Sequence, residues 1–140
     1  MPELTLQHEE LAAVLRQVDS ELAALERRAA AQEVLPLAPT VECVLELVSR
    51  LIVACIVAQG GKQAPGPAAD VLDAFKVLVK GEPRWNAIRD NCRELVYYRN
   101  CIKMGRLDAL PAVPGKMAVR TARHIFLYIK TRCLREGIQG

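Results

Sequence analysis

The residues that could carry chemistry are two histidines, five cysteines and a set of lysines and arginines in the second half of the chain. Neither His8 nor His124 has a cysteine, serine or carboxylate at a spacing typical of a catalytic triad. The glycines form neither a P-loop nor a GxGxxG motif. We therefore expect no catalytic residue and no cofactor in this chain, and we expect its function to be binding.

The cysteines predict a reducing compartment. They are odd in number and include no CxxC pair, which argues against a disulfide framework and against a metal site. The N-terminus has no basic-then-apolar signal sequence. The only uncharged part of the most apolar stretch is 51–58, whereas a membrane span needs roughly 20 apolar residues. We expect a cytoplasmic chain that does not enter a membrane.

Charge is divided unevenly along the chain. Residues 1–70 carry 5 Lys and Arg against 10 Asp and Glu, whereas residues 71–140 carry 14 against 6. A basic half of this kind predicts an acidic partner, unless its cations are only solvated helix faces. The aromatic residues are poorly interleaved with the cations, which disfavours nucleic acid as the partner. Two groups of cations fall at helical spacing: Arg84, Arg89 and Arg93, and Lys116, Arg120 and Arg123.

Helices must position these cations. Aromatic residues make up only 4% of the chain, and no alternating run of strand length occurs, so the fold class is predicted to be all-α. Prolines and glycines divide the chain into expected helices at 3–35, 41–58, 69–79, 83–103 and 116–135. The segments 60–69 and 105–115 are expected to be loops, and Thr40 is expected to cap the second helix.

The first and last of these helices carry a heptad pattern. In the first helix the seam includes Leu11, Leu15, Val18, Leu22 and Leu25. In the last helix the same spacing joins Ala118, Ala122, Ile125 and Ile129. This pattern predicts a small helical bundle at the end of an antiparallel two-helix coiled-coil stalk. The alternative for the first helix is an amphipathic helix packed on a globular core.

Three short segments occur in a recognisable order. A bend marked by Pro36 and Pro39 precedes an apolar helix, Trp85 and Arg89 begin a second helix, and residues 114–120 begin a basic last helix. This order resembles the microtubule-binding domain at the tip of the dynein heavy-chain stalk, over about residues 20–135. The resemblance implies a stalk strand at 1–35, a tip domain at 36–116, and a last helix and returning strand at 117–140.

The resemblance also implies microtubule binding. Arg89, Lys116 and Arg120 would contact tubulin, and Thr40 and Val41 would lie next to the track. The other members of the two cation groups, Arg84, Arg93 and Arg123, are included in the predicted surface. Sliding of one coil strand past the other would control affinity, and ATP hydrolysis would belong to a motor ring outside this chain. An accessory dynein light chain is a further implied partner, and the implied location is the cytoskeleton of the cytoplasm or of a ciliary axoneme.

A different class of function stays open on the residues alone. A stand-alone adaptor could dimerise through residues 4–29 and present its basic half to an acidic protein or to nucleic acid. In that arrangement the seam of the first helix would pair with a second copy of the chain.

Overall fold

The structure is a computed structural model that describes residues 2–32, 34–66 and 69–135. These residues form five α-helices and two short 3₁₀ helices. The 3₁₀ helices, at Pro83–Ile88 and Leu107–Ala109, precede the last two α-helices. No strand occurs in the described part of the chain, so the all-α prediction is confirmed. The helices are α1 (Pro2–Ala30), α2 (Leu37–Gln59), α3 (Val71–Val79), α4 (Arg89–Lys103) and α5 (Pro114–Arg135).

The bend between α1 and α2 differs from the prediction at both of its ends. The first helix ends at Ala30 rather than at residue 35, and Gln32 adopts a left-handed φ of 62°. The second helix begins at Leu37, because a proline in the first turn loses no helical hydrogen bond. The Thr40 amide already donates to the Pro36 carbonyl at 3.0 Å. The predicted cap at Thr40 is therefore wrong, since this residue lies inside the helix.

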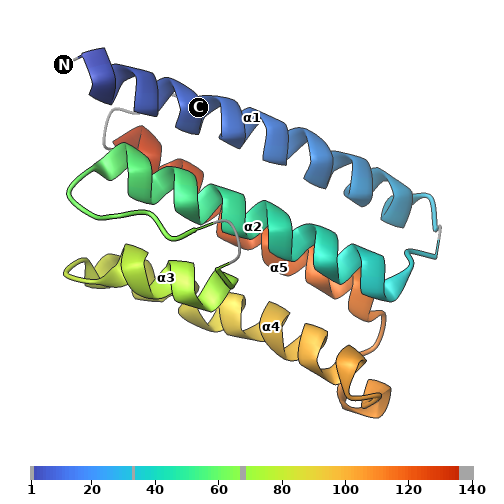
Figure 1. The fold of residues 1–140 in the computed structure, drawn as a ribbon. Helices are drawn as coiled ribbons and strands as arrows, with labels where there is room; N and C mark the ends of the chain where they lie inside the picture. Colours follow the sequence, from blue (N-terminus) through green and yellow to red (C-terminus); the bar gives the residue numbers. More distant parts are fainter. Residues whose placement is uncertain (1, 33, 67–68, 136–140) are drawn as a thin grey trace.

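The bundle is built around α2 (Figure 1). The helices α1 and α5 pack on α2 and on each other, and α3 and α4 cover another side of it. Helix α1 runs antiparallel to α2, since His8 Nε2 donates to the Ala58 carbonyl at 3.2 Å and Arg50 donates to both Gln17 and Glu21. Along the sequence colours of Figure 1, α5 runs back in the direction opposite to α1.

The predicted seam residues form part of one continuous core. All of them are buried except Leu25, which is half-buried and packs against the same core. That core includes residues from all three of the predicted parts, 1–35, 36–116 and 117–140. The seam of α1 faces α2 as well as α5. In the described residues α1 therefore packs as a helix of the bundle, which is the alternative to a two-stranded coil.

The start of α4 is anchored by an aromatic contact. Trp85 is buried and meets the ring of Tyr128 edge to face, with 5.9 Å between the ring centroids. The Tyr128 hydroxyl donates to the Arg84 carbonyl at 2.7 Å. These contacts hold the 3₁₀ helix before α4 against α5, so they fix where the cations of α4 lie.

Truncation of a seam side chain tests this packing. Leu22 is 0% exposed, so Leu22→Ala should lower the free energy of unfolding by about 2–5 kcal/mol, measured by urea denaturation. The control is Leu127→Ala, because Leu127 is 51% exposed and should change that free energy by about 0.5 kcal/mol or less. Equal effects of the two substitutions would contradict the docking of α1 on the bundle.

Acid should reveal the link between α3 and α4. Arg99 donates to the two carboxylate oxygens of Asp70 at 2.8 and 3.3 Å, and this hydrogen bond lowers the pKa of Asp70. A carboxyl whose pKa is lowered by folding stabilises the fold above its unfolded pKa, and the effect is lost as the pH falls through the folded value. Asp70→Asn should therefore destabilise the protein near neutral pH. The difference from wild type should begin to shrink near the ordinary carboxyl pKa of about 4 and should vanish only below the lowered pKa that Asp70 has in the fold.

The matched control is Asp73→Asn. Asp73 is exposed in the first turn of α3, which directly follows Asp70 at the N-cap, and it makes no ion pair with the described residues. Its removal should leave the pH dependence of the unfolding free energy unchanged. A pH profile that is the same for wild type and Asp70→Asn would show that the pair with Arg99 is not formed.

Candidate functional site

Helix α5 concentrates positive charge. Its 22 residues include six Lys and Arg and no Asp or Glu. One side of the helix is buried through Ala118, Ala122, Ile125 and Ile129. The opposite side is exposed along a stripe that contains Lys116, Arg120, His124, Leu127, Thr131 and Arg135. We call this set of six residues the α5 stripe.

Two cations of the α5 stripe are available to a partner. Lys116 and Arg120 are one helical turn apart and point to solvent. Neither makes an ion pair with the described residues. Both were predicted to bind tubulin, and the structure leaves both accessible.

Arg123 has a different role from the one predicted. Its side chain is 18% exposed and lies between α1 and α5. It donates to the Asp19 carboxylate at 2.7 Å and to the Glu26 carboxylate at 2.7 and 3.0 Å. These hydrogen bonds, that with Glu26 above all, raise the pKa of Arg123. Its place on the predicted binding surface is therefore wrong, because its donors are used within the chain.

The cations at the start of α4 are only partly available. Arg84 is half-buried, pairs with Glu82 at 2.9 Å and lies over the ring of Trp85 at 5.6 Å. Arg89 has a side chain that is 49% exposed and lies 3.9 Å from Asp90. Arg93 is exposed and makes no ion pair with the described residues. Of these three cations, Arg84 is therefore the least accessible to a partner and Arg93 is the most accessible.

The packing of α4 on α5 decides which cations come together. The two helices are antiparallel, and Thr121 Oγ1 donates to Glu94 at 2.8 Å (Figure 1). The neighbouring residues Arg93 and Arg120 are therefore close to level along the pair. Arg89 and Lys116 lie toward opposite ends, roughly 15 Å apart along the axes at 1.5 Å per residue. Arg93, Lys116 and Arg120 are all exposed, and Arg93 is nearer than Arg89 to the level of Arg120 along the helix pair.

Two further predicted site residues are inside the core. Val41 is 0% exposed and Thr40 is 4% exposed. Both lie in the first turns of α2. Neither side chain can face a track in this arrangement, so their predicted place beside it is wrong.

The carboxylates that hold Arg123 were missed by sequence reasoning. Asp19 and Glu26 are seven residues apart, and each follows a seam residue directly. Arg123 likewise follows the seam residue Ala122. Opposite charges that flank two seams are the usual sign of salt bridges between helices. This pattern could have paired the residues before the structure was known.

Other kinds of site find no support in the described part of the chain. The five cysteines are free, and four of them are buried. No three histidine, cysteine, aspartate or glutamate side chains gather closely enough to hold a metal ion among the described residues. Within the same residues, no helix combines the length and the apolar character needed to cross a membrane. Comparisons with protein-family models, with curated proteins and with solved structures find no match to the chain.

Removal of the Arg123 charge should loosen α1 from α5. Arg123→Gln leaves two carboxylates without their partner, and we expect a loss of about 1–2 kcal/mol, since both carboxylates are partly solvated. Arg120→Gln, on the exposed side of the same helix, is the control and should cost about 0.5 kcal/mol or less. A double-mutant cycle with Glu26→Gln measures the coupling, and a coupling of zero would refute the link.

Proposed function

We propose that this chain is a microtubule-binding helical module that uses Lys116 and Arg120 of the α5 stripe together with Arg93 of α4. The observation that carries the proposal is the charge of α5, which has six cations and no anion, and whose exposed Lys116 and Arg120 make no ion pair with the described residues. Such a surface is complementary to an acidic protein. The order of the proline bend, the Trp85 helix start and the basic last helix, which resembles a dynein stalk tip, supports the microtubule as that protein.

The physics of this surface fits a contact that forms and breaks repeatedly. Exposed cations accelerate encounter with an acidic surface, and salt screens the attraction over a Debye length of about 8 Å at physiological ionic strength. The α5 stripe contains one large apolar residue, Leu127, which adds little affinity alone. Binding is therefore expected to be weak, fast and strongly dependent on salt. The module would act on the cytoskeleton, in the cytoplasm or in a ciliary axoneme.

The finer part of the proposal concerns control through helix register. Helices α1 and α5 are antiparallel neighbours, as the two strands of a stalk would be (Figure 1). Arg123 binds carboxylates on α1 from a position three residues after Arg120. A slide of α1 by one helical turn, about 5.4 Å, would take Asp19 and Glu26 away from Arg123. We propose that this cluster holds one register, and that its rupture would shift the neighbouring cations of the α5 stripe.

Burial of the α1 seam favours this proposal over the dimeric adaptor. Leu11, Leu15, Val18 and Leu22 are already covered by α2 and α5 of the same chain. A parallel dimer through residues 4–29 would have to uncover that surface first. This cost disfavours self-pairing as the primary use of α1.

Charge reversal on α5 tests the binding surface. In co-sedimentation with stabilised microtubules, the double variant Lys116→Glu, Arg120→Glu should bind at least about tenfold more weakly, equivalent to about 1.4 kcal/mol. Arg93→Glu should act in the same direction, and more strongly than Arg89→Glu. Wild-type binding should weaken as salt rises.

The matched control reverses two exposed cations elsewhere. Arg16→Glu, Arg27→Glu changes the net charge by the same amount on α1, and it should alter the affinity by about twofold or less. Circular dichroism and thermal unfolding should show that both double variants are folded. Equal weakening by the two double variants, or failure of the wild type to pellet with microtubules, would refute the proposal.

A further inference from the structure

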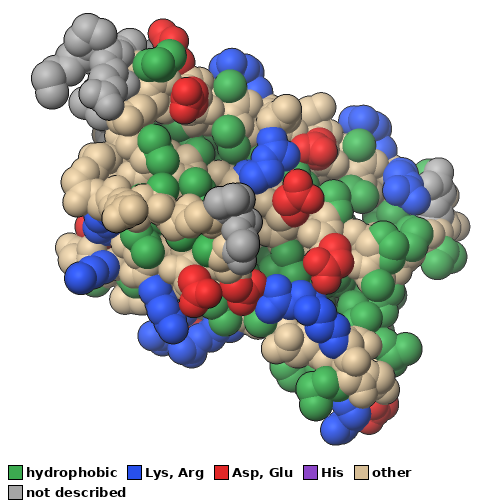
Figure 2. Space-filling model, viewed as in Figure 1, with side chains coloured by type: hydrophobic (Ala, Val, Ile, Leu, Met, Phe, Trp, Pro, Cys, Tyr) green, Lys and Arg blue, Asp and Glu red, His purple; other side chains and the backbone are tan. Residues whose placement is uncertain are grey.

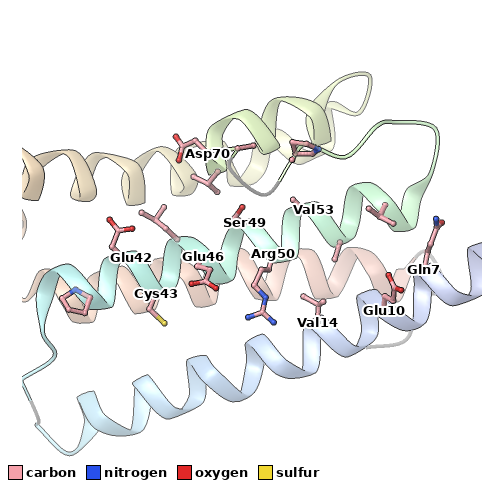
Figure 3. Close-up of a pocket in the computed structure, with 18 residues that line it drawn as sticks. Gln7, Glu10, Val14, Glu42, Cys43, Glu46, Ser49, Arg50, Val53 and Asp70 are labelled. Atoms are coloured by element: carbon pink, nitrogen blue, oxygen red, sulfur yellow. The ribbon is translucent and has the colours of Figure 1, made fainter.

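The second accessible feature of the fold is a groove along α2, on a side of that helix that α5 does not cover. It has a volume of about 980 Å³, and α2 forms its floor. Helix α1 forms one wall, and residues 65–66 and 69–71 contribute to the other (Figure 3). Since α1 and α3 do not pack on each other in the described residues, the space above α2 between them stays open.

The floor of the groove is apolar over much of its length. Val53, Ala54 and Val57 of α2 are only partly buried, and Val14 of α1 lines the same groove and points toward α2 (Figure 3). The lining of α2 extends from Pro39 to Val57, which is roughly 27 Å at 1.5 Å per residue. This length matches a helix of about 18 residues, so the groove has the dimensions of a helix-binding site.

The rim of the groove is acidic although the chain as a whole carries a charge of +3. Glu10, Glu42 and Glu46 are exposed at the groove and make no ion pair with the described residues. The arginine that lines the groove, Arg50, is bonded to Gln17 and Glu21 on α1. Figure 2 shows acidic side chains along the middle of this face, beside apolar ones.

The thiol of Cys43, at the α1 side of the groove, lies near two acidic side chains. Burial raises the pKa of Cys43, and the carboxylates of Glu21 and Glu46 raise it further. A cationic group placed in the groove would therefore meet a negative potential above an apolar floor.

We infer that this groove binds an amphipathic helix of a partner protein, with apolar side chains on Val14, Val53 and Val57 and with lysines or arginines on Glu42, Glu46 and Glu10. Acidic rims and an apolar floor select a helix that is basic on its flanks and apolar on one edge. The basic helix of a second copy does not meet this requirement. The apolar side of α5 is buried in its own core, so α5 offers cations without an apolar edge.

A designed peptide can test the groove without knowledge of the natural partner. The probe is a labelled peptide of about 18 residues that places leucines at helical positions i, i+3, i+4 and i+7 and lysines elsewhere. Fluorescence anisotropy should show saturable binding to the full chain. A peptide with glutamates in place of the lysines should bind at least about tenfold more weakly.

Variants of the chain then locate the contact. Glu42→Lys, Glu46→Lys should weaken binding of the Leu/Lys peptide at least about tenfold. Val53→Ser, Val57→Ser should also weaken it, at unchanged charge. The control Glu9→Lys, Asp73→Lys reverses two exposed carboxylates outside the groove lining and should change the affinity by about twofold or less.

Three outcomes would overturn the inference. Equal effects of the groove and control variants would show nonspecific attraction to an acidic protein. Amide chemical shifts that move on α4 and α5 rather than on α2 would place the peptide elsewhere. A change in sedimentation coefficient of the groove variant without peptide would make the groove an interface between copies. None of these outcomes bears on microtubule binding, which is measured on different residues and with a different partner.

Discussion

The rest of the structure depends on one constraint, which is that the apolar surface of α2 has to be buried by neighbouring helices. Eleven of the 23 residues of this helix are buried, and α1, α3, α4 and α5 all pack against it. A helix that is apolar around most of its circumference is stable in water only when neighbours remove that surface from solvent. Each neighbour needs one apolar side for α2 and can expose the other, so α5 can be basic on its outer side. The groove is the part of α2 that the four neighbours leave open.

Two cations that are close in sequence on α5 have different environments because of this packing. Arg120 and Arg123 are three residues apart, yet the former is exposed and the latter is held by two carboxylates of α1. Successive residues of a helix are rotated by about 100°. A side chain three positions further along can therefore face a neighbouring helix while the first faces solvent. Charge at helical spacing alone does not distinguish the two cases. The difference depends on where α1 lies.

Much of the fold follows from local sequence. Prolines and glycines mark the ends of the helices to within a few residues, and the start of α5 at Pro114 agrees with the preference of proline for the first turn. The seam residues of α1 were correctly predicted to face a partner. The number of helices that these residues face could not be predicted, because spacings of 3.5 and 3.6 residues diverge by only about 20° over one heptad and both describe Leu11, Leu15 and Val18.

The candidate surface was harder to predict than the helices, for a physical reason. The exposure of Lys116 and Arg120 depends only on which side of α5 is apolar, and the sequence pattern shows that side. The burial of Thr40 and Val41 depends on how α1 folds back over the start of α2, and no local sequence pattern determines that arrangement. The groove depends on a space between α1 and α3, which are far apart in sequence and do not pack closely on each other in the described residues.

The two surfaces select partners through different physics, and this difference is a consequence of the same packing. The α5 stripe has cations above a buried apolar side, so its attraction is electrostatic and is screened by salt. The groove combines carboxylates with partly buried apolar side chains, so the proposed partner would retain the hydrophobic part of its binding when salt screens the rest. The lining of the groove and the α5 stripe have no residue in common, so the two proposed partners would not compete for the same side chain. Both α1 and α2 pack on α5 and line the groove, so either helix can carry a coupling between the two sites.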